Sequence, residues 1–204
     1  MPTITRLLPF RSIDERDKIN GYSLNTASGE AGTFVKVVSA ELTKDPVAYV
    51  NSSYYNNTLG NATSQFPEVI HKVGATSGTG DGGQVLGMLL NDVRTVDENG
   101  ESLLFYPAKK AELQCVFSGE AVPIATEGIV DLFVPRALEG GVVPAINSAA
   151  VLGANGKVTG VAFTSLTADQ RNAVVGKFIG TGYRESQQTT DSFAGAYARL
   201  KFSV

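Results

Sequence analysis

Short stretches in which apolar and polar residues alternate recur along most of the chain. They cover residues 33–42, 46–55, 68–73, 111–119, 121–135, 177–183 and 196–204. A period of two with β-branched and aromatic residues is typical of strands that bury one face. Turn residues interrupt these stretches about every 8–12 residues, as in sandwiches and barrels. The pattern therefore predicts an all-β fold, a compact β-barrel or β-sandwich.

Turn residues also predict which strands pair as hairpins. Asn155-Gly156, between two apolar stretches, is the strongest short hairpin signal in the chain. The sequence Asp-Glu-Asn-Gly at 97–100 predicts the turn of a hairpin over residues 85–107. Glu127-Gly128 predicts a short turn within residues 121–135. One short helix is expected after Thr167, with Gln170 completing a capping box.

The first 25 residues show no strong period, and Pro2 and Pro9 disfavour a continuous helix. We therefore expect an N-terminal arm over 1–25 and a β domain over 26–204. Residues 135–141 interrupt the strand pattern and mark a weak subdivision of that domain. The arm is either a solvated connector or a segment that becomes ordered on another surface.

Net charge bears on the partners of the chain, and cysteine content bears on disulfides. The chain has 17 basic and 20 acidic residues among 204, a net charge of −3, and no cluster of Lys or Arg. Because neutralised phosphates supply most of the affinity for nucleic acids, we expect neither nucleic acid nor an anionic membrane as a partner. The single cysteine excludes an intramolecular disulfide. The first residues lack the apolar core of a signal peptide, so synthesis in a reducing cytoplasm is expected.

The segment GTGDGG at 78–83 has glycines at the spacing of a dinucleotide-binding fingerprint, namely Gly78, Gly80 and Gly83. That fingerprint works only between a strand and a helix whose N-terminus faces the pyrophosphate. Here four residues separate it from the preceding apolar run, and hairpin signals follow it. We expect a mobile surface loop between two strands, which contacts a neighbouring subunit if it has a role.

Catalytic and metal-binding residues are scarce. One histidine and one cysteine cannot form a structural zinc site, and the nucleophile motif G-x-S-x-G is absent. The carboxylates of Asp97, Glu98 and Glu101 flank a tight turn and are expected to point apart into solvent. Cys115 is expected to be a buried thiol and His71 a structural strand residue. We expect no enzymatic activity, cofactor or metal, although a glycosidase-type carboxylate pair stays open.

The N-terminal segment TRLLPFRSIDERDKINGYSLN, followed by GTFVKVV, resembles the start of virion structural proteins of tailed bacteriophages, of the capsid decoration or cement type. The segments VLGMLLNDV, FSGEAVPIATEGIVDL and SAAVLGANGKVTG are also similar to decoration proteins. The resemblance implies a short arm leading into a compact β-barrel or β-tulip domain. It implies a homotrimer on the outer surface of the phage head, which bridges subunits of the major capsid protein and stabilises the shell.

If the arm contacts the capsid, its apolar and basic residues are the expected contacts: Ile4, Arg6, Leu7, Leu8, Phe10 and Arg11. A head-fibre, tail or baseplate protein is a close alternative within the virion. The alternative from another class is a small ligand-binding β-barrel enzyme that uses the glycine loop or the turn at 97–101.

Overall fold

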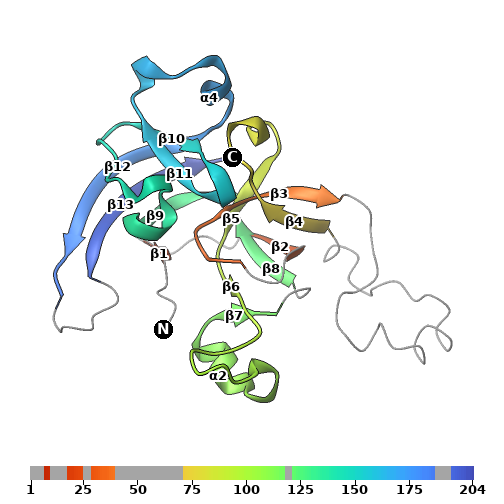
Figure 1. Cartoon of the computed structure of the whole chain (residues 1–204). Coiled ribbons are helices and arrows are strands. Elements are labelled where there is room, and N and C mark those ends of the chain that lie inside the picture. Colours follow the sequence, from red (N-terminus) through yellow and green to blue (C-terminus); the bar gives the residue numbers. More distant parts are fainter. Residues whose placement is uncertain (1–6, 10–17, 25–28, 40–70, 118–120, 187–193) are drawn as a thin grey trace.

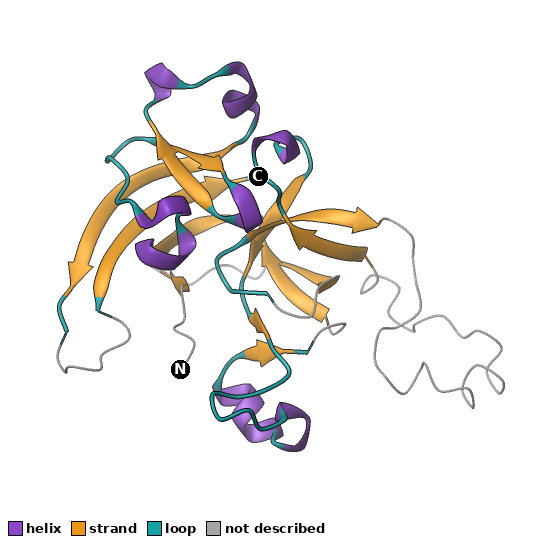
Figure 2. Ribbon diagram, in the orientation of Figure 1, coloured by secondary structure: helices purple, strands orange, loops and turns teal. Residues whose placement is uncertain are grey.

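The chain forms two main sheets and a small projecting lobe (Figures 1 and 2). A computed structural model describes residues 7–9, 18–24, 29–39, 71–117, 121–186 and 194–204. The predicted strand at 46–55 lies outside these residues. The described part is mostly strand, so the all-β class is confirmed.

The larger sheet has six strands, all paired antiparallel. From one edge to the other it contains β1 (Leu7–Pro9), β9 (Glu127–Phe133), β13 (Gly195–Ser203), β12 (Val174–Arg184), β10 (Ala149–Leu152) and β11 (Val158–Val161). This sheet is open, with β1 and β11 at its edges. The expected barrel over residues 26–204 therefore does not describe it.

The second group of strands pairs in a ring in the order β2, β4, β3, β5, β8 and back to β2. Their bounds are β2 (Lys18–Leu24), β4 (His71–Ala75), β3 (Phe34–Ser39), β5 (Val85–Leu89) and β8 (Ala121–Ala125). The β2·β4 pair is parallel, and the others are antiparallel. We call these five strands the strand ring.

Three short helices and a two-stranded pair complete the described elements. The helices are α2 (Pro107–Glu112), α3 (Val134–Ala137) and α4 (Ala168–Asn172), and short 3₁₀ turns lie between strands. The parallel pair is β6 (Asp92–Val93) with β7 (Cys115–Val116). The predicted helix is α4, and its capping box between Thr167 and Gln170 is confirmed. The prediction of only one helix is wrong.

Two apolar clusters hold the strands together. The smaller cluster lies among the ring strands and β6, and it includes Val73, Leu89 and Ile124. The larger cluster joins the six-stranded sheet to the ring, because it contains Phe34 of β3 together with Phe202 of β13. These two rings meet edge to face with their centroids 5.7 Å apart. The two sheets therefore share one core.

The predicted hairpin over residues 121–135 is wrong, because β8 belongs to the ring and β9 to the six-stranded sheet. The chain passes between them at Thr126, whose carbonyl accepts the N–H of Val204 at 3.0 Å. Alternation reports that each strand buries one face, but it does not identify the partner strand. Residues 135–141 link β9 to β10 inside one sheet, so they do not separate two units.

The segment expected as an N-terminal arm contributes two strands to this chain's own sheets. Leu7, Leu8 and Pro9 pair with Leu132, Asp131 and Val130 of β9. Residues 18–24 form β2 and pair with β4 and β8. The arm prediction therefore does not hold for the described residues of the 1–25 segment.

Candidate interaction surface

Residues 94–114 leave the strand ring, run outward and return as a small lobe (Figure 1). The parallel pairing of β6 with β7 closes the base of this lobe. Asp92 fixes the base because its Oδ1 accepts the N–H of Ala31 at 2.8 Å. Its Oδ2 accepts a hydrogen bond from Nη2 of Arg94 at 2.9 Å. The base of the lobe is thus held to residues 29–31, just before β3, by the Gly29–Val93 backbone bridge and by the Asp92 side chain.

A buried carboxylate organises the interior of the lobe. The Asp97 side chain has no exposed surface, and its Oδ2 pairs with Nζ of Lys109. Its Oδ1 accepts the backbone N–H groups of Asn99 and Glu101, each at 2.8 Å. Gly100 takes the positive φ of 84° that this turn requires. The predicted turn is confirmed, but the expectation that Asp97 points into solvent is wrong.

The protonation of this pair follows from its contacts. The hydrogen bond from Lys109 lowers the pKa of Asp97, the N–H groups of Glu101 and Asn99 lower it further, and burial opposes them. The same contact raises the pKa of Lys109, with Glu98 adding a second carboxylate at 3.4 Å. The carboxylate therefore stays charged and engaged. In the described part of the chain, no three His, Cys, Asp or Glu side chains gather as metal ligands.

The outer end of the lobe carries three consecutive large apolar side chains. Leu103 is buried, whereas Leu104, Phe105 and Tyr106 are 67%, 75% and 48% exposed. We call these three exposed residues the lobe tip. The backbone is fixed there, since the N–H of Tyr106 donates to the carbonyl of Leu103 at 3.2 Å. Pro107 then starts α2 at the position where proline suits a helix. The tip is therefore presented in a defined conformation.

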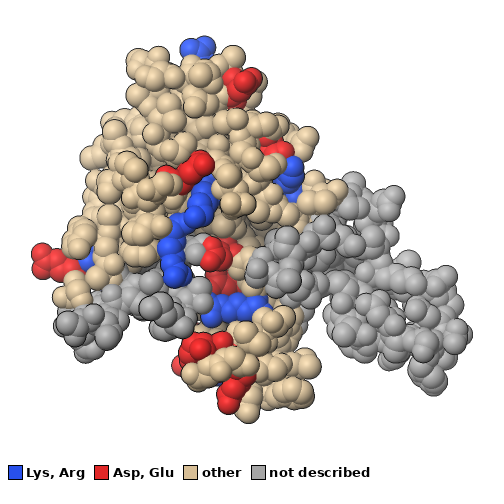
Figure 3. All heavy atoms as spheres, viewed as in Figure 1, with Lys and Arg blue, Asp and Glu red and all other residues tan. Residues whose placement is uncertain are grey.

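Figure 3 shows few charged side chains on this face of the molecule. Lys and Arg side chains there are few; some adjoin in a short row near the middle of the face, with Asp and Glu side chains beside it. Most of the surface visible around them is uncharged. The lobe tip exposes a cluster of large apolar side chains, and such a cluster suits contact with another protein surface.

In the glycine loop, the carboxylate of Asp81 uses the hydrogen-bond donors that a phosphate group would need. Asp81 accepts hydrogen bonds from the N–H and hydroxyl of Ser77, each at 2.5 Å, and from Nζ of Lys36 at 2.7 Å. Lys36 and then Ser77 lower the pKa of Asp81 to about 2. Because the backbone donor and the cation are already used, the loop offers little to a phosphate group.

The same loop packs against α4. A Cβ on Gly82 would lie 2.2 Å from the carbonyl oxygen of Asn172, which leaves no room for a side chain. Gly78 has a φ of 119°, a conformation that favours glycine. The loop is thus held from two sides by Asp81 and by α4, and it is not the loose surface loop that the sequence predicted.

Cys115 and His71 occupy the strands expected for them. Cys115 is 5% exposed in β7, and burial raises the pKa of its thiol. Its Sγ lies 3.6 Å from the carbonyl oxygen of Lys110, to which it donates. A buried thiol with a raised pKa is a poor nucleophile, which agrees with the predicted structural role. His71 begins β4 and pairs with Tyr22 of β2.

The residues expected to contact a capsid divide into two groups. Leu7 and Leu8 lie in β1, where their backbone pairs with β9. The remaining four lie outside the described residues: Ile4, Arg6, Phe10 and Arg11. The structure therefore gives the first two a place in this chain's own sheet, and their role toward a partner stays a prediction.

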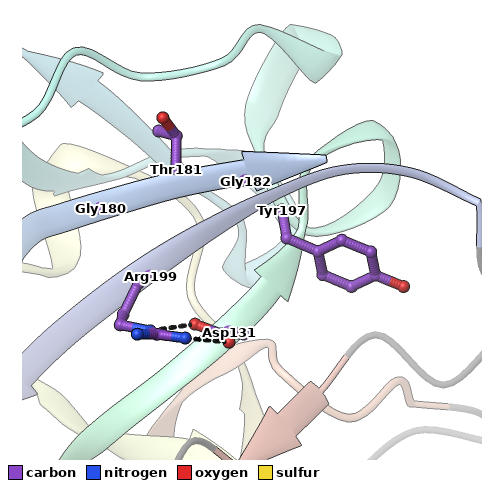
Figure 4. Close-up of a pocket in the computed structure, with 6 residues that line it drawn as sticks. All are labelled: Asp131, Gly180, Thr181, Gly182, Tyr197 and Arg199. Carbon is purple, nitrogen blue, oxygen red and sulfur yellow. Dashed lines mark hydrogen bonds and ion pairs between the residues drawn. The ribbon is translucent and has the colours of Figure 1, made fainter. Parts of the chain in front are cut away.

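A small pocket of about 140 Å³ lies over β9, β12 and β13 (Figure 4). Arg199 binds Asp131 through two parallel hydrogen bonds of 2.7 and 2.8 Å. Figure 4 shows Tyr197 and Arg199 extending from β13, while Thr181 points away from Arg199. The hydrogen bonds that Arg199 donates to Asp131 raise the pKa of Arg199 above its usual range. The charged groups satisfy each other, and the pocket offers no nucleophile beside a base.

Comparison with protein-family models, with curated proteins and with solved structures finds no match to this chain. No helix of the described residues is long and apolar enough to span a bilayer. The sequence pattern does not reveal the lobe tip, because the apolar run 103–106 fits the second strand of the hairpin predicted over residues 85–107. The available signal was Pro107 followed by good helix formers, which predicts the start of a helix.

Proposed function

We propose that this chain is a non-enzymatic structural protein of a tailed-bacteriophage virion, of the capsid decoration type. In this proposal it binds the outer surface of the head as a homotrimer and bridges subunits of the major capsid protein. The observation that carries the proposal is the lobe tip, three large apolar side chains held in a fixed turn and left exposed. The resemblance of the sequence to decoration proteins supplies the kind of partner.

The energetics of the tip favour a partner surface. Burying a Leu or Phe side chain contributes about 1.5–3 kcal/mol each relative to leaving it exposed. Because the turn is already ordered by Asp97 and α2, little conformational entropy is lost when the tip is covered. One tip gives only weak binding after the entropy of association is subtracted. Three tips in a trimer, bound to a repeating lattice, act together and raise the avidity.

The finer architecture belongs to the same proposal. The strand ring formed by β2, β4, β3, β5 and β8 is the element that corresponds to the barrel or β-tulip domain implied by the resemblance. Its pairing of β2 with β4 and β8 draws residues 18–24 into the domain. The trimer contacts, the orientation on the head and the location in the virion are parts of the proposal.

The test is binding of the purified chain to expanded, undecorated phage heads, measured by co-sedimentation. Leu104→Ser with Phe105→Ser removes the two most exposed apolar side chains of the lobe tip and leaves Leu103 and Asp97 unchanged. Val142→Ser with Val143→Ser is the matched control, because those valines are 69% and 49% exposed on another loop. We expect the tip variant to lose at least tenfold in head binding and the control to bind as the unmodified chain does.

Equal binding by the tip variant would contradict the role of the lobe, and failure of the unmodified chain to bind heads would contradict the proposed function. Melting temperatures of all three proteins should agree, because the substituted side chains are exposed. Deletion of residues 1–12 is a less direct test, since it also removes β1 from the six-stranded sheet.

A further inference from the structure

A second candidate surface lies on the six-stranded sheet, away from the lobe. Lys177 of β12 and Lys201 of β13 are directly opposite each other in the antiparallel pair, and both are exposed. They line an open groove of about 320 Å³ whose other walls include Phe163, Val174 and Phe202. Phe163 is 51% exposed and lines the groove. The groove thus combines an apolar wall with two neighbouring cations.

The lysine pair contributes nothing to folding that is evident in the described structure. Like charges directly opposite on neighbouring strands destabilise a sheet, by a few tenths of a kcal/mol to about 1 kcal/mol. Neither lysine makes an ion pair with any residue that the structure describes. Glu127 lies on the same sheet opposite Ser203, but no ion pair joins it to Lys201. A carboxylate between the two ammonium groups would relieve their repulsion.

Arg199, on the same sheet, is a cation that does have a partner within the fold. It lies two residues from Lys201 on β13, and its cross-strand neighbour Asp131 binds it through two hydrogen bonds. Ile129 takes the corresponding position opposite Lys201, so that strand supplies no carboxylate there. The sheet therefore leaves Lys177 and Lys201 without the internal partner that it provides for Arg199.

The geometry points to this groove as a binding site for an acidic segment of a partner protein. The segment places carboxylates over Lys177 and Lys201 and an apolar side chain against Phe163 and Val174. Two cations are too few to follow a nucleic-acid backbone, which needs a longer row of phosphate contacts. The apolar wall also distinguishes the site from a simple anion site. This inference does not rest on the lobe tip, which lies on different elements.

The experiment uses two blocked tripeptides as probes, acetyl-Asp-Phe-Glu-amide and its neutral counterpart acetyl-Asn-Phe-Gln-amide. Each is titrated into the isotopically labelled full chain at low ionic strength, and the amide shifts of β12 and β13 are followed by NMR. We expect the acidic peptide to bind about tenfold more tightly than the neutral one and to weaken as salt is added. The shifts should centre on Lys177 and Lys201.

The double variant Lys177→Gln, Lys201→Gln should abolish the difference between the peptides. Its melting temperature should be unchanged or higher, because the repulsion is removed. Arg136→Gln is the matched control, since α3 packs on the core side of the sheet through Val134 and Ala137 and Arg136 makes no ion pair there. That control should bind both peptides as the unmodified chain does.

Four results would overturn the inference. They are equal binding of the two peptides, absence of binding by both, displacement of the peptide by inorganic phosphate at equal concentration, and tighter binding of a single-stranded oligonucleotide at the same residues. The first two exclude a role for the lysine charges, and the last two assign the groove to another ligand. None of them bears on head binding through the lobe tip, so the two proposals fail separately.

Discussion

The contact between Phe34 and Phe202 predicts how strongly the two sheets depend on each other. Phe34 has no exposed surface, and its ring meets Phe202 edge to face across the boundary between the strand ring and the six-stranded sheet. Phe34→Ala removes this ring from the shared core. Phe34 belongs to the larger apolar cluster, so the truncation leaves a cavity between the two sheets.

Truncating a fully buried Phe to Ala destabilises a protein by about 3–5 kcal/mol, through lost transfer energy and the cavity left behind. The edge-to-face contact accounts for about 0.5–1.5 kcal/mol of this. For a chain of this size, each kcal/mol lowers the melting temperature by about 2–4 °C. We therefore expect Phe34→Ala to melt roughly 10 °C below the unmodified chain, in a single transition that both sheets share.

The assay is calorimetric and chemical unfolding of Phe34→Ala beside Phe163→Ala. Phe163 is half exposed, so its truncation should lower the free energy of unfolding by about 1 kcal/mol or less. A double-mutant cycle with Phe202→Ala should give a coupling within the range of an aromatic pair. Equal effects of Phe34→Ala and Phe163→Ala, or two separate transitions in the unmodified chain, would refute the shared core.

Three further predictions concern local contacts. The Asp81 carboxylate has its pKa lowered to about 2 against an ordinary value of 3.8, so it contributes up to about 2 kcal/mol to the free energy of unfolding. This contribution is present above pH 4 and is lost as pH falls toward 2, and Asp81→Asn should remove it from a pH series of unfolding curves. Gly82→Ala should destabilise the chain in thermal unfolding because its Cβ would meet α4, whereas Gly80→Ala, where nothing lies within 4 Å, should not. Thr167→Ala should weaken α4 by about 1 kcal/mol through loss of the capping box, visible as faster amide hydrogen exchange confined to that helix, and exchange equal to the unmodified chain would count against it.

The sequence was sufficient to predict those features whose conformation depends only on residues close together in the chain. The hairpin of β10 and β11 was predicted from Asn155-Gly156, and both residues adopt the positive φ expected there, 56° and 72°. The capping box of Thr167 and Gln170 was predicted because it is complete within four residues. Each of these features depends on backbone geometry that a few side chains impose without help from the rest of the fold.

Features that depend on distant contacts were not predictable in the same way. Alternation in residues 121–135 identified two strands, but only packing assigns β8 to the ring and β9 to the six-stranded sheet. In residues 107–112, helix formers after Pro107 outweighed the strand pattern that begins at Ala111. The burial of Asp97 required Lys109, twelve positions away, to pair with it. The lobe tip depends on both the helix after Pro107 and the pairing of Asp97 with Lys109. The sequence pattern predicts neither of them, so it does not predict the tip.

The most direct test of the proposed function is a count of this chain in purified, DNA-filled heads of the bacteriophage to which the proposal assigns it. Quantitative mass spectrometry of the intact particles gives its ratio to the major capsid protein. The proposal predicts a fixed ratio close to one copy per capsid subunit, as trimers at repeated lattice positions require. Absence from heads, or a few copies confined to the tail fraction, would contradict it.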